Sequence, residues 1–447
     1  MLSRIVGLWF MASACFAQDT TRLSLLFLGD IMQHDSQIQS AHNALTGSYN
    51  YEPCFRFVKK YFMDADLTIG NLELTLGGKP YKGYPQFSAP DALAAALKSA
   101  GVNVLVTANN HSVDRRKKGL ERTIRVLDSL EILHTGTFRD TVERLNDYPL
   151  LISKNGITLA LLNYTYGTNG IPVTKPNVVN LIDTAVIRKD LYQARQRNPD
   201  LTIVFMHWGN EYQNQPSKEQ KKLAEFCLLH GANLVIGAHP HVLQPMEWRK
   251  DQQQVVIYSL GNFISGQRDR YRDGAASVKV ELSKVYYSDS VSVTSITDVG
   301  YVLNWVYKTP GTKPAFYVLP VPDFEGDTTT FVNNEASWLA FRRFIDDSRK
   351  LLSGNREIRE IVRPAPDSTV RYRVGWSTTA TEKYFGATLQ PMDYRFGIET
   401  KTDALGNEQI WLGDFRRRND AEEHLKRVLA RYPEAKLFTV VNGKLQD

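Results

Sequence analysis

The stretch Leu23-Ser24-Leu25-Leu26-Phe27-Leu28 runs directly into Gly29-Asp30, and this pattern decides how the rest of the chain is interpreted. Short apolar runs bounded by glycine and polar residues are typical of buried β-strands. Five more such runs follow before residue 263, and each also ends in a small polar cluster. These clusters are Gly70-Asn71-Leu72-Glu73, Ala108-Asn109-Asn110-His111, His207-Trp208-Gly209, Gly237-Ala238-His239-Pro240-His241 and Ser259-Leu260-Gly261-Asn262.

Amphipathic helix candidates alternate with these strand candidates, at residues 91–100, 115–130, 184–197 and 217–230. Alternation of this kind predicts an α/β architecture. In α/β proteins, ligands collect at the carboxyl ends of the strands. We therefore expect distant parts of the chain to deliver carboxylate, amide and imidazole groups to one edge of a sheet.

These groups have the chemistry of metal ligands. Asp30 and Glu73 offer hard carboxylate oxygens, and His207, His239 and His241 offer imidazoles that suit zinc, manganese or iron. His239 and His241 are two residues apart, so an extended backbone would turn both rings the same way. Any one of them alone is more often a structural residue. Together at strand ends they favour a site for one or two divalent ions, with magnesium as a further candidate.

The bulk composition fits an ordinary globular protein. The chain has 447 residues, of which 43% are hydrophobic and 23% charged. The net charge of +6 is a thin excess without a long basic block, so we expect no nucleic-acid partner. The tetrad Arg115-Arg116-Lys117-Lys118 could attract an anionic polymer, although a solvated helix face explains it more simply.

The first 17 residues are typical of a secretory signal peptide. A short basic start precedes an apolar stretch, and Cys15-Phe16-Ala17 offers a small-residue cleavage site before Gln18. We therefore expect export to the periplasm or cell envelope. A lipid anchor at Cys15 is the less favoured alternative, because Ala12 stands where a lipobox has leucine.

The composition divides the rest of the chain into three parts. Residues 20–330 form the α/β domain, in which alternating runs between 275 and 320 predict added antiparallel strands. Residues 331–368 comprise a helix over 335–352 and a proline-rich linker. Residues 369–447 form a small α+β unit with strands at 409–415 and 436–441 and a helix from Asn419.

The six motifs resemble, in the same order, those of the CapA family, the poly-γ-glutamate capsule biosynthesis branch of the calcineurin-like metallophosphoesterase superfamily. The resemblance implies a central β-sandwich flanked by helices, with metal ions at one edge. It also implies that His111 protonates a leaving group. The implied metal ligands are Asp30, Asn110, His207, His239 and His241.

Three positions depart from the superfamily pattern. Met32 stands where the first motif usually has histidine, Asn71 where a metal-bridging aspartate is usual, and Ser112 where an acid follows the histidine. His34, Glu73 and Asp114, respectively, lie nearby in sequence. Two hypotheses follow. The protein is a metal-dependent hydrolase or transferase acting on an anionic cell-surface polymer, or a non-catalytic assembly factor that binds the polymer.

Further substrate contacts are expected close to the predicted ligands. Glu211 and Tyr212 come just after His207 and could face a substrate, or they simply form a loop that leads into a helix. The full set of candidate contacts is His34, Asn71, Glu211, Tyr212 and Asn262.

The C-terminal unit resembles the SPOR family of peptidoglycan-binding domains in Gly413-Asp414-Phe415 followed by Ala421. That resemblance implies peptidoglycan as a further partner, with Trp376, Tyr394 and Trp411 as candidates to stack on sugars. A generic ferredoxin-like cap or dimerisation unit is the alternative.

Overall fold

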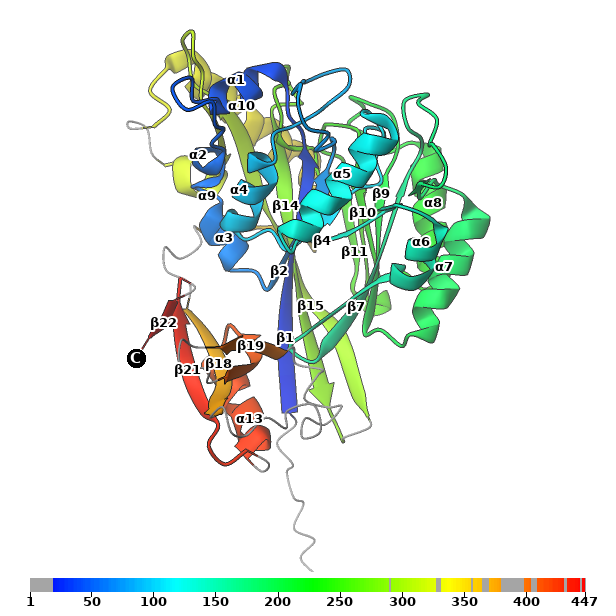
Figure 1. Cartoon of the computed structure of the whole chain (residues 1–447), viewed down its shortest axis with the longest axis vertical. Coiled ribbons are helices and arrows are strands. Elements are labelled where there is room, and N and C mark those ends of the chain that lie inside the picture. Colours follow the sequence, from blue (N-terminus) through cyan, green and yellow to red (C-terminus); the bar gives the residue numbers. More distant parts are fainter. Residues whose placement is uncertain are drawn as a thin grey trace, which may run out of the picture.

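The computed structural model describes residues 19–446 apart from 289–290, 327–330, 355–356, 364–369, 379–397, 403–407, 430–431 and 443. The predicted signal peptide and Tyr394 therefore lie outside the described residues. Two large sheets face each other and carry helices on their outer sides, with a smaller sheet at one end (Figure 1). No helix in the described part of the chain is long and apolar enough to cross a membrane.

The first large sheet has nine strands in the order β16-β15-β14-β1-β2-β3-β4, with β13 beside β1 and β17 beside β15. In chain order these are β1 (Asp19–Ile31), β2 (Leu67–Leu72), β3 (Val104–Val106), β4 (Leu133–Thr135), β13 (Asn262–Ile264), β14 (Gly274–Tyr286), β15 (Ser292–Lys308), β16 (Phe316–Pro320) and β17 (Arg359–Glu360). Strands β1 to β4 pair in parallel, so their carboxyl ends share one edge.

The second large sheet has six strands in the order β11-β12-β10-β9-β7-β6. They are β6 (Leu150–Lys154), β7 (Ile157–Thr165), β9 (Leu201–His207), β10 (Leu234–Ala238), β11 (Met246–Arg249) and β12 (Gln254–Ile257). Strands β7, β9, β10 and β12 are parallel neighbours. A two-strand ribbon joins β5 (Thr137–Phe138) to β8 (Val178–Val179).

The helices cover the outer faces of the two sheets. On the first sheet lie α1 (Asp35–Ala41), α2 (Glu52–Phe55), α3 (Lys59–Met63), α4 (Ala92–Ala100) and α5 (Arg116–Ser129). On the second lie α6 (Thr141–Asp147), α7 (Thr184–Gln196) and α8 (Lys218–Leu229), and β11 ends in the 3-10 turn η1 (Lys250–Gln252). The short α9 (Val321–Phe324) and the long α10 (Glu335–Leu352) follow β16.

The main hydrophobic core lies between the two sheets. Phe27 and Ile69 from the first sheet and Ile203 and Ile236 from the second are fully buried in one cluster. Separate clusters lie beneath the helices on each outer face. The predicted fold class, a helix-flanked β-sandwich, is thereby confirmed.

The six apolar runs are all strands, but they divide between the two sheets. The first three become β1, β2 and β3, and the last three become β9, β10 and β12. The expectation that they meet at the edge of one sheet is therefore wrong. A continuous apolar run is buried on both faces, and this is true of an inner strand in either layer of a sandwich.

The segment predicted as a helix and linker belongs to the sandwich in its described part, whereas residues 364–368 of the linker lie outside the described residues. Helix α10 sets Phe341 and Phe344 into the main core, with the Phe341 ring 5.4 Å from that of Trp305. Strand β17 pairs with β15. The described part of 331–368 thus completes the first sheet and its cover.

In its described residues, the C-terminal unit is a five-stranded sheet in the order β19-β20-β18-β21-β22, with the helix α13 packed on it. Its elements are β18 (Val370–Thr378), β19 (Ile398–Thr402), β20 (Glu408–Phe415), α13 (Arg418–Leu429), β21 (Lys436–Val441) and β22 (Lys444–Gln446). Trp376 and Trp411 are only 4% and 6% exposed, so neither ring is available to stack on a sugar.

Buried charge attaches this unit to the sandwich. The Arg371 guanidinium contacts the Asp66 carboxylate and donates to the Met63 carbonyl at 2.8 Å. On the neighbouring surface, Arg22 Nη1 lies 2.6 Å from Asp420 Oδ1. The unit therefore docks where β1 begins, at the end of the sandwich opposite the carboxyl ends of the parallel strands (Figure 1).

Candidate metal centre

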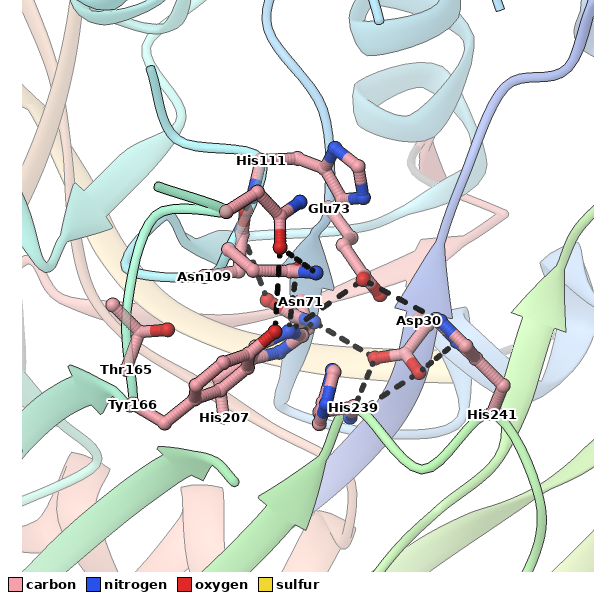
Figure 2. Close-up of polar contacts among 12 residues, drawn as sticks. Asp30, Asn71, Glu73, Asn109, His111, Thr165, Tyr166, His207, His239 and His241 are labelled. Atoms are coloured by element: carbon pink, nitrogen blue, oxygen red, sulfur yellow. Dashed lines mark hydrogen bonds and ion pairs between the residues drawn. The ribbon is translucent and has the colours of Figure 1, made fainter. Parts of the chain in front are cut away.

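The residues predicted as metal ligands meet at the shared edge of the two sheets (Figure 2). Asp30 is the penultimate residue of β1 and Glu73 directly follows β2, whereas His207 ends β9. His239 and His241 follow β10, and their rings are 5.8 Å apart. The rings of His207 and His239 are 4.8 Å apart, so the imidazoles of the second sheet face the carboxylates of the first.

The two closing histidines reach the site through a strained turn. His239 has a φ of 98° and His241 a φ of 59°, both in the left-handed region that non-glycine residues rarely adopt. The expectation of an extended backbone here is wrong. Strand β10 ends at Ala238, and a turn aims both rings back at Asp30 and Glu73. Such strain costs on the order of 1–3 kcal/mol per residue and clusters at functional sites.

Asp30 is held as an ionised, fully buried carboxylate. Its Oδ1 accepts a hydrogen bond from Asn71 Nδ2 at 2.8 Å, and its Oδ2 lies 3.1 Å from His241 Nδ1. Burial acts to raise the pKa of Asp30, but the contacts with His241 and Asn71 outweigh it and leave the pKa below its usual value. Asp30 is thus kept in the charged form that a cation requires.

Glu73 is the least satisfied group in the site. Neither of its buried carboxyl oxygens has a hydrogen-bond partner among the described residues. Oε1 lies 3.5 Å from His207 Nε2 and 3.8 Å from His241 Nε2. Burial, reinforced by the neighbouring charge of Asp30, raises the pKa of Glu73 well above its usual value. A buried carboxylate without partners is costly, and a bound cation would offset that cost.

The unpartnered carboxyl group of Glu73 and the imidazoles around it form a set of donor atoms that fits divalent metal ions. Two groups have ligand atoms within 4.8 Å of one another, Glu73 with His239 and His241, and Glu73 with Asp30 and His207. Glu73 is common to both. Mixed carboxylate and imidazole donors suit zinc, manganese or iron.

His207 and His239 are held in the neutral form that metal ligation needs. Burial, followed by the proximity of His239, lowers the pKa of His207 well below its usual value. Burial likewise lowers the pKa of His239 to about 3. His207 Nε2 lies 2.8 Å from Asn110 Oδ1, so the predicted amide ligand is adjacent to the predicted imidazole ligand.

Asn71 supports the ligands from below. Its side-chain amide donates to Asp30 and also lies 3.2 Å from His207 Nδ1. It therefore bridges a carboxylate of the first sheet and an imidazole of the second. Asn71 is 1% exposed, so it is as deeply buried as the ligands that it contacts.

His111 faces Asp114 in a buried pair. His111 Nδ1 is 2.7 Å from Asp114 Oδ2, which also accepts a hydrogen bond from the Phe87 backbone N–H at 2.7 Å. Ser112 instead donates to the Thr107 carbonyl at 2.6 Å. The acid missing at position 112 is therefore supplied by Asp114, three residues after His111 in the same turn.

Met32 and His34 lie outside both ligand groups. Met32 is 1% exposed and packs in the apolar cluster beneath the first sheet's helices. His34 Nδ1 accepts a hydrogen bond from the Gly266 backbone N–H at 3.1 Å, and burial lowers its pKa to about 4. The histidine that the superfamily has at the first motif thus has no counterpart among the described ligand groups.

The mouth of the site carries two half-exposed tyrosines. Tyr212 lies with its ring 6.0 Å from that of His241 and next to the exposed Glu211. Tyr166 lies with its ring 4.5 Å from that of His239, and its hydroxyl is 3.3 Å from Asn169 Oδ1 (Figure 2). Sequence reasoning missed Tyr166. The sequence feature that could have indicated it is the largely apolar run 157–164, which is typical of a buried strand. No charged or imidazole group follows that run to mark its end as part of a site.

Asn262 and the basic tetrad are the remaining features that the sequence singled out. Asn262 is fully buried, and its Oδ1 lies 3.1 Å from His241 Nδ1, so it orients that ring from behind. Lys117 in the basic tetrad lies 3.8 Å from Glu121 on the same helix, as expected of a solvated helix face.

Comparisons with known proteins agree with the family resemblance. The family model described as "Bacterial capsule synthesis protein PGA_cap" matches residues 24–267. "Capsule biosynthesis protein CapA" of Bacillus anthracis is 31% identical over 265 residues, which are 56% of this chain and 61% of that protein. "PGA biosynthesis protein CapA" of Bacillus subtilis is 30% identical over 264 residues, covering 57% and 66%. The chain thus spans less than two thirds of either relative.

Among solved structures, the chain is similar to the calcineurin-like phosphoesterase YfkN of Bacillus subtilis, with a TM-score of 0.39 and 12% identity over 74% of this chain and 98% of that one. It is also similar to the NAD nucleotidase NadN of Haemophilus influenzae, with a TM-score of 0.39 and 12% identity over 94% and 95% of the two chains.

Proposed function

Because this chain belongs to the bacterial capsule synthesis protein family, we propose that it is an exported metal-dependent hydrolase or transferase acting on an anionic cell-surface polymer. The names of its relatives make a poly-γ-glutamate-like capsule polymer the first substrate to test. The observation that carries the proposal is Glu73, a buried carboxyl without hydrogen-bond partners at the overlap of two ligand groups.

The chain's own residues divide the work at this site. Glu73, His239 and His241 would hold one ion, and Glu73, Asp30 and His207 a second one, with Asn110 next to His207. Such ions, when bound, would activate water and polarise the bond to be broken. Asp114 orients His111 through Nδ1, which leaves Nε2 to deliver a proton to the leaving group.

A non-catalytic assembly factor is the second candidate. Its support is the buried Met32, which leaves the Asp30 side of the site one imidazole short, together with Asn71 in place of a carboxylate. Such a protein would hold the polymer at this edge without cleaving it.

Metal content and polymer length separate the two candidates. The purified chain would be loaded with Mn²⁺ or Zn²⁺, desalted and analysed by elemental mass spectrometry. It would then be incubated with poly-γ-glutamate, and the length distribution followed on a gel. Retained metal with a shift in length that His111→Ala abolishes supports the enzyme. Polymer binding without retained metal or any shift supports the assembly factor.

Export is tested separately. Cleavage after Ala17 would leave a mature protein that begins at Gln18, and mass analysis of envelope protein measures this directly. A retained Met1 would refute export by this route, and a lipid on Cys15 would indicate the anchored form.

A further inference from the structure

Tyr166 lies at the candidate metal centre, and the proposed function gives it no role. It directly follows β7, and its backbone N–H donates to the His207 carbonyl at 3.0 Å. Strands β7 and β9 pair in register up to Thr165 and His207, so the backbone of Tyr166 is fixed relative to a predicted metal ligand. Its side chain is nevertheless 48% exposed. Tyr166 is therefore anchored to the site and still accessible to a substrate.

The ring of Tyr166 packs against the imidazoles of the second sheet. Its centre lies 4.5 Å from that of the His239 ring and 6.3 Å from that of the His207 ring, to which it is nearly parallel at 10°. One of these imidazoles belongs to each candidate ligand group. The phenol ring thus lies beside both groups, as Figure 2 shows. A substrate group held at either of them would be close to this ring.

The hydroxyl group of Tyr166 is loosely held on the side of the ligands. It lies 3.3 Å from Asn169 Oδ1, an oxygen that also accepts a hydrogen bond from Asn110 Nδ2 at 3.2 Å (Figure 2). Both distances are long for hydrogen bonds of these types. A hydroxyl hydrogen rotates to suit its acceptor, so it can turn from Asn169 to another oxygen while the ring stays in place.

A hydrogen-bond donor at this position is chemically useful. The ionised Asp30 cannot donate, and the Asn110 amide already donates to Asn169. Tyr166 supplies a neutral donor that these neighbours do not. A donor that is already in place stabilises an oxygen on which negative charge develops during a reaction, and this effect is often a large part of catalysis.

The charges around the hydroxyl define when an anionic oxygen could approach it. Glu211 at the exposed mouth and Glu73 within the site are both close enough for their charges to act on Tyr166. These carboxyl groups would repel an anion from the metal-free site. Bound cations would reverse that repulsion, so we expect an oxyanion to contact Tyr166 only in the metal-loaded protein.

We propose that Tyr166 is a catalytic residue whose hydroxyl donates a hydrogen bond to an oxygen of the substrate group under attack. In a γ-glutamyl amide this would be the carbonyl oxygen, which gains negative charge as its carbon becomes tetrahedral. The proton stays on the phenol oxygen, and only the acceptor changes, from Asn169 to the substrate. His111 serves the leaving group, so the two residues act on different atoms. The inference rests on the proposed function, because it needs a substrate held at the ligand groups.

Binding of inorganic phosphate tests this donor without depending on turnover. Phosphate is a tetrahedral oxyanion and so resembles the charged, tetrahedral species that the hydroxyl would stabilise. The full-length chain is loaded with Mn²⁺ and desalted, its metal content is measured, and phosphate is titrated by calorimetry. We expect Tyr166→Phe to weaken phosphate binding about 10-fold or more, because it loses a hydrogen bond to a charged group. Turnover on the polymer should fall about 10²-fold.

The variants separate the donor from a structural role. Phenylalanine keeps the ring that packs on His239 and His207, so metal content and thermal stability should stay near those of the parent chain. Tyr192→Phe removes the hydroxyl of another exposed tyrosine, on α7, and is the matched control that should not change phosphate affinity.

The inference is overturned if the metal-loaded parent does not bind phosphate, if Tyr166→Phe binds it as tightly as the parent, or if Tyr192→Phe weakens binding equally. Loss of metal from Tyr166→Phe would also overturn it, since the hydroxyl would then serve to hold the ligands. In each of these cases the parent retains metal and the proposed function stands. A parent chain that retains no metal would instead refute the proposed function, and the inference with it.

Discussion

His207 Nε2 lies 3.5 Å from Glu73 Oε1, and this contact joins the two sheets of the sandwich across their shared edge. The imidazole is at the end of β9 in the second sheet, whereas the carboxyl group directly follows β2 in the first. A cation held between them would therefore connect the two layers at the polar edge of their apolar core.

Metal addition should stabilise the protein against heat. An ion that binds only the folded state adds about 2.7 kcal/mol to the free energy of unfolding at a concentration one hundred times Kd. Differential scanning calorimetry with and without Mn²⁺ or Zn²⁺ measures this. Glu73→Gln should remove most of the gain, and Glu211→Gln at the exposed mouth should retain it. An equal gain in both variants would refute the central position of Glu73.

His111 and His241 should separate catalysis from metal binding. His111→Ala should lower turnover on the polymer about 10²- to 10⁴-fold while metal content stays near that of the parent chain, since His111 faces Asp114 and belongs to neither ligand group. His241→Ala should lower both. The measurements are elemental analysis and initial rates on the same preparations, and similar metal loss in the two variants would contradict this division.

The buried pair between Arg371 and Asp66 should control docking of the C-terminal unit. Asp66 has a side chain only 1% exposed, so Arg371→Met leaves a buried charge with weaker compensation from Arg416 at 3.4 Å. We expect a loss of about 3 kcal/mol in the free energy of unfolding, measured with urea. Arg359→Met in β17, which breaks an exposed pair with Asp298, is the control and should cost less than about 1 kcal/mol.

Acid should loosen the C-terminal unit. Burial lowers the pKa of His424 to about 4, against about 6.5 in an unfolded chain. Above pH 6.5 the ring is neutral in both states, whereas below it the unfolded state binds a proton that the folded state does not. Stability is therefore lost as the pH falls from 6.5 towards 4, by up to about 1.4 kcal/mol per pH unit.

Hydrogen exchange of peptides from β20 and α13 across this pH range measures the effect. His424→Leu should flatten the pH dependence of exchange in these peptides, because leucine cannot take up a proton. His134→Leu, a change of the same kind in the first sheet, should leave the pH dependence of these peptides unaltered. A dependence that persists in His424→Leu would assign it to another group.

Much of the fold could be predicted from the sequence because buried parallel strands have a recognisable pattern, a continuous apolar run. The runs that end at Asp30, Asn71 and His207 are apolar on both faces and change abruptly to polar residues, and parallel pairing brings their ends together. The division of those runs between two sheets could not be read, because an inner strand has the same pattern in either layer.

The geometry of the site could be predicted from the sequence to a smaller extent. Asp114 contacts His111 because of the conformation of one turn. The orientation of the His241 ring depends on a left-handed backbone φ, which a histidine in the sequence does not predict. Tyr166 follows its strand without a charged neighbour that would mark it as part of a site. These positions depend on loop geometry, which is set by contacts between distant segments.

Strand β1 also fixes the distance between the C-terminal unit and the candidate metal centre. Arg22, which contacts Asp420 of the C-terminal unit, and Asp30, which lies in the metal centre, are eight residues apart on this one strand. At about 3.3 Å per residue, they are separated by roughly 26 Å of stiff backbone. If the C-terminal unit rests on a surface, β1 fixes the distance between that surface and the candidate metal centre, and the proposed polymer would have to extend that far to reach the site.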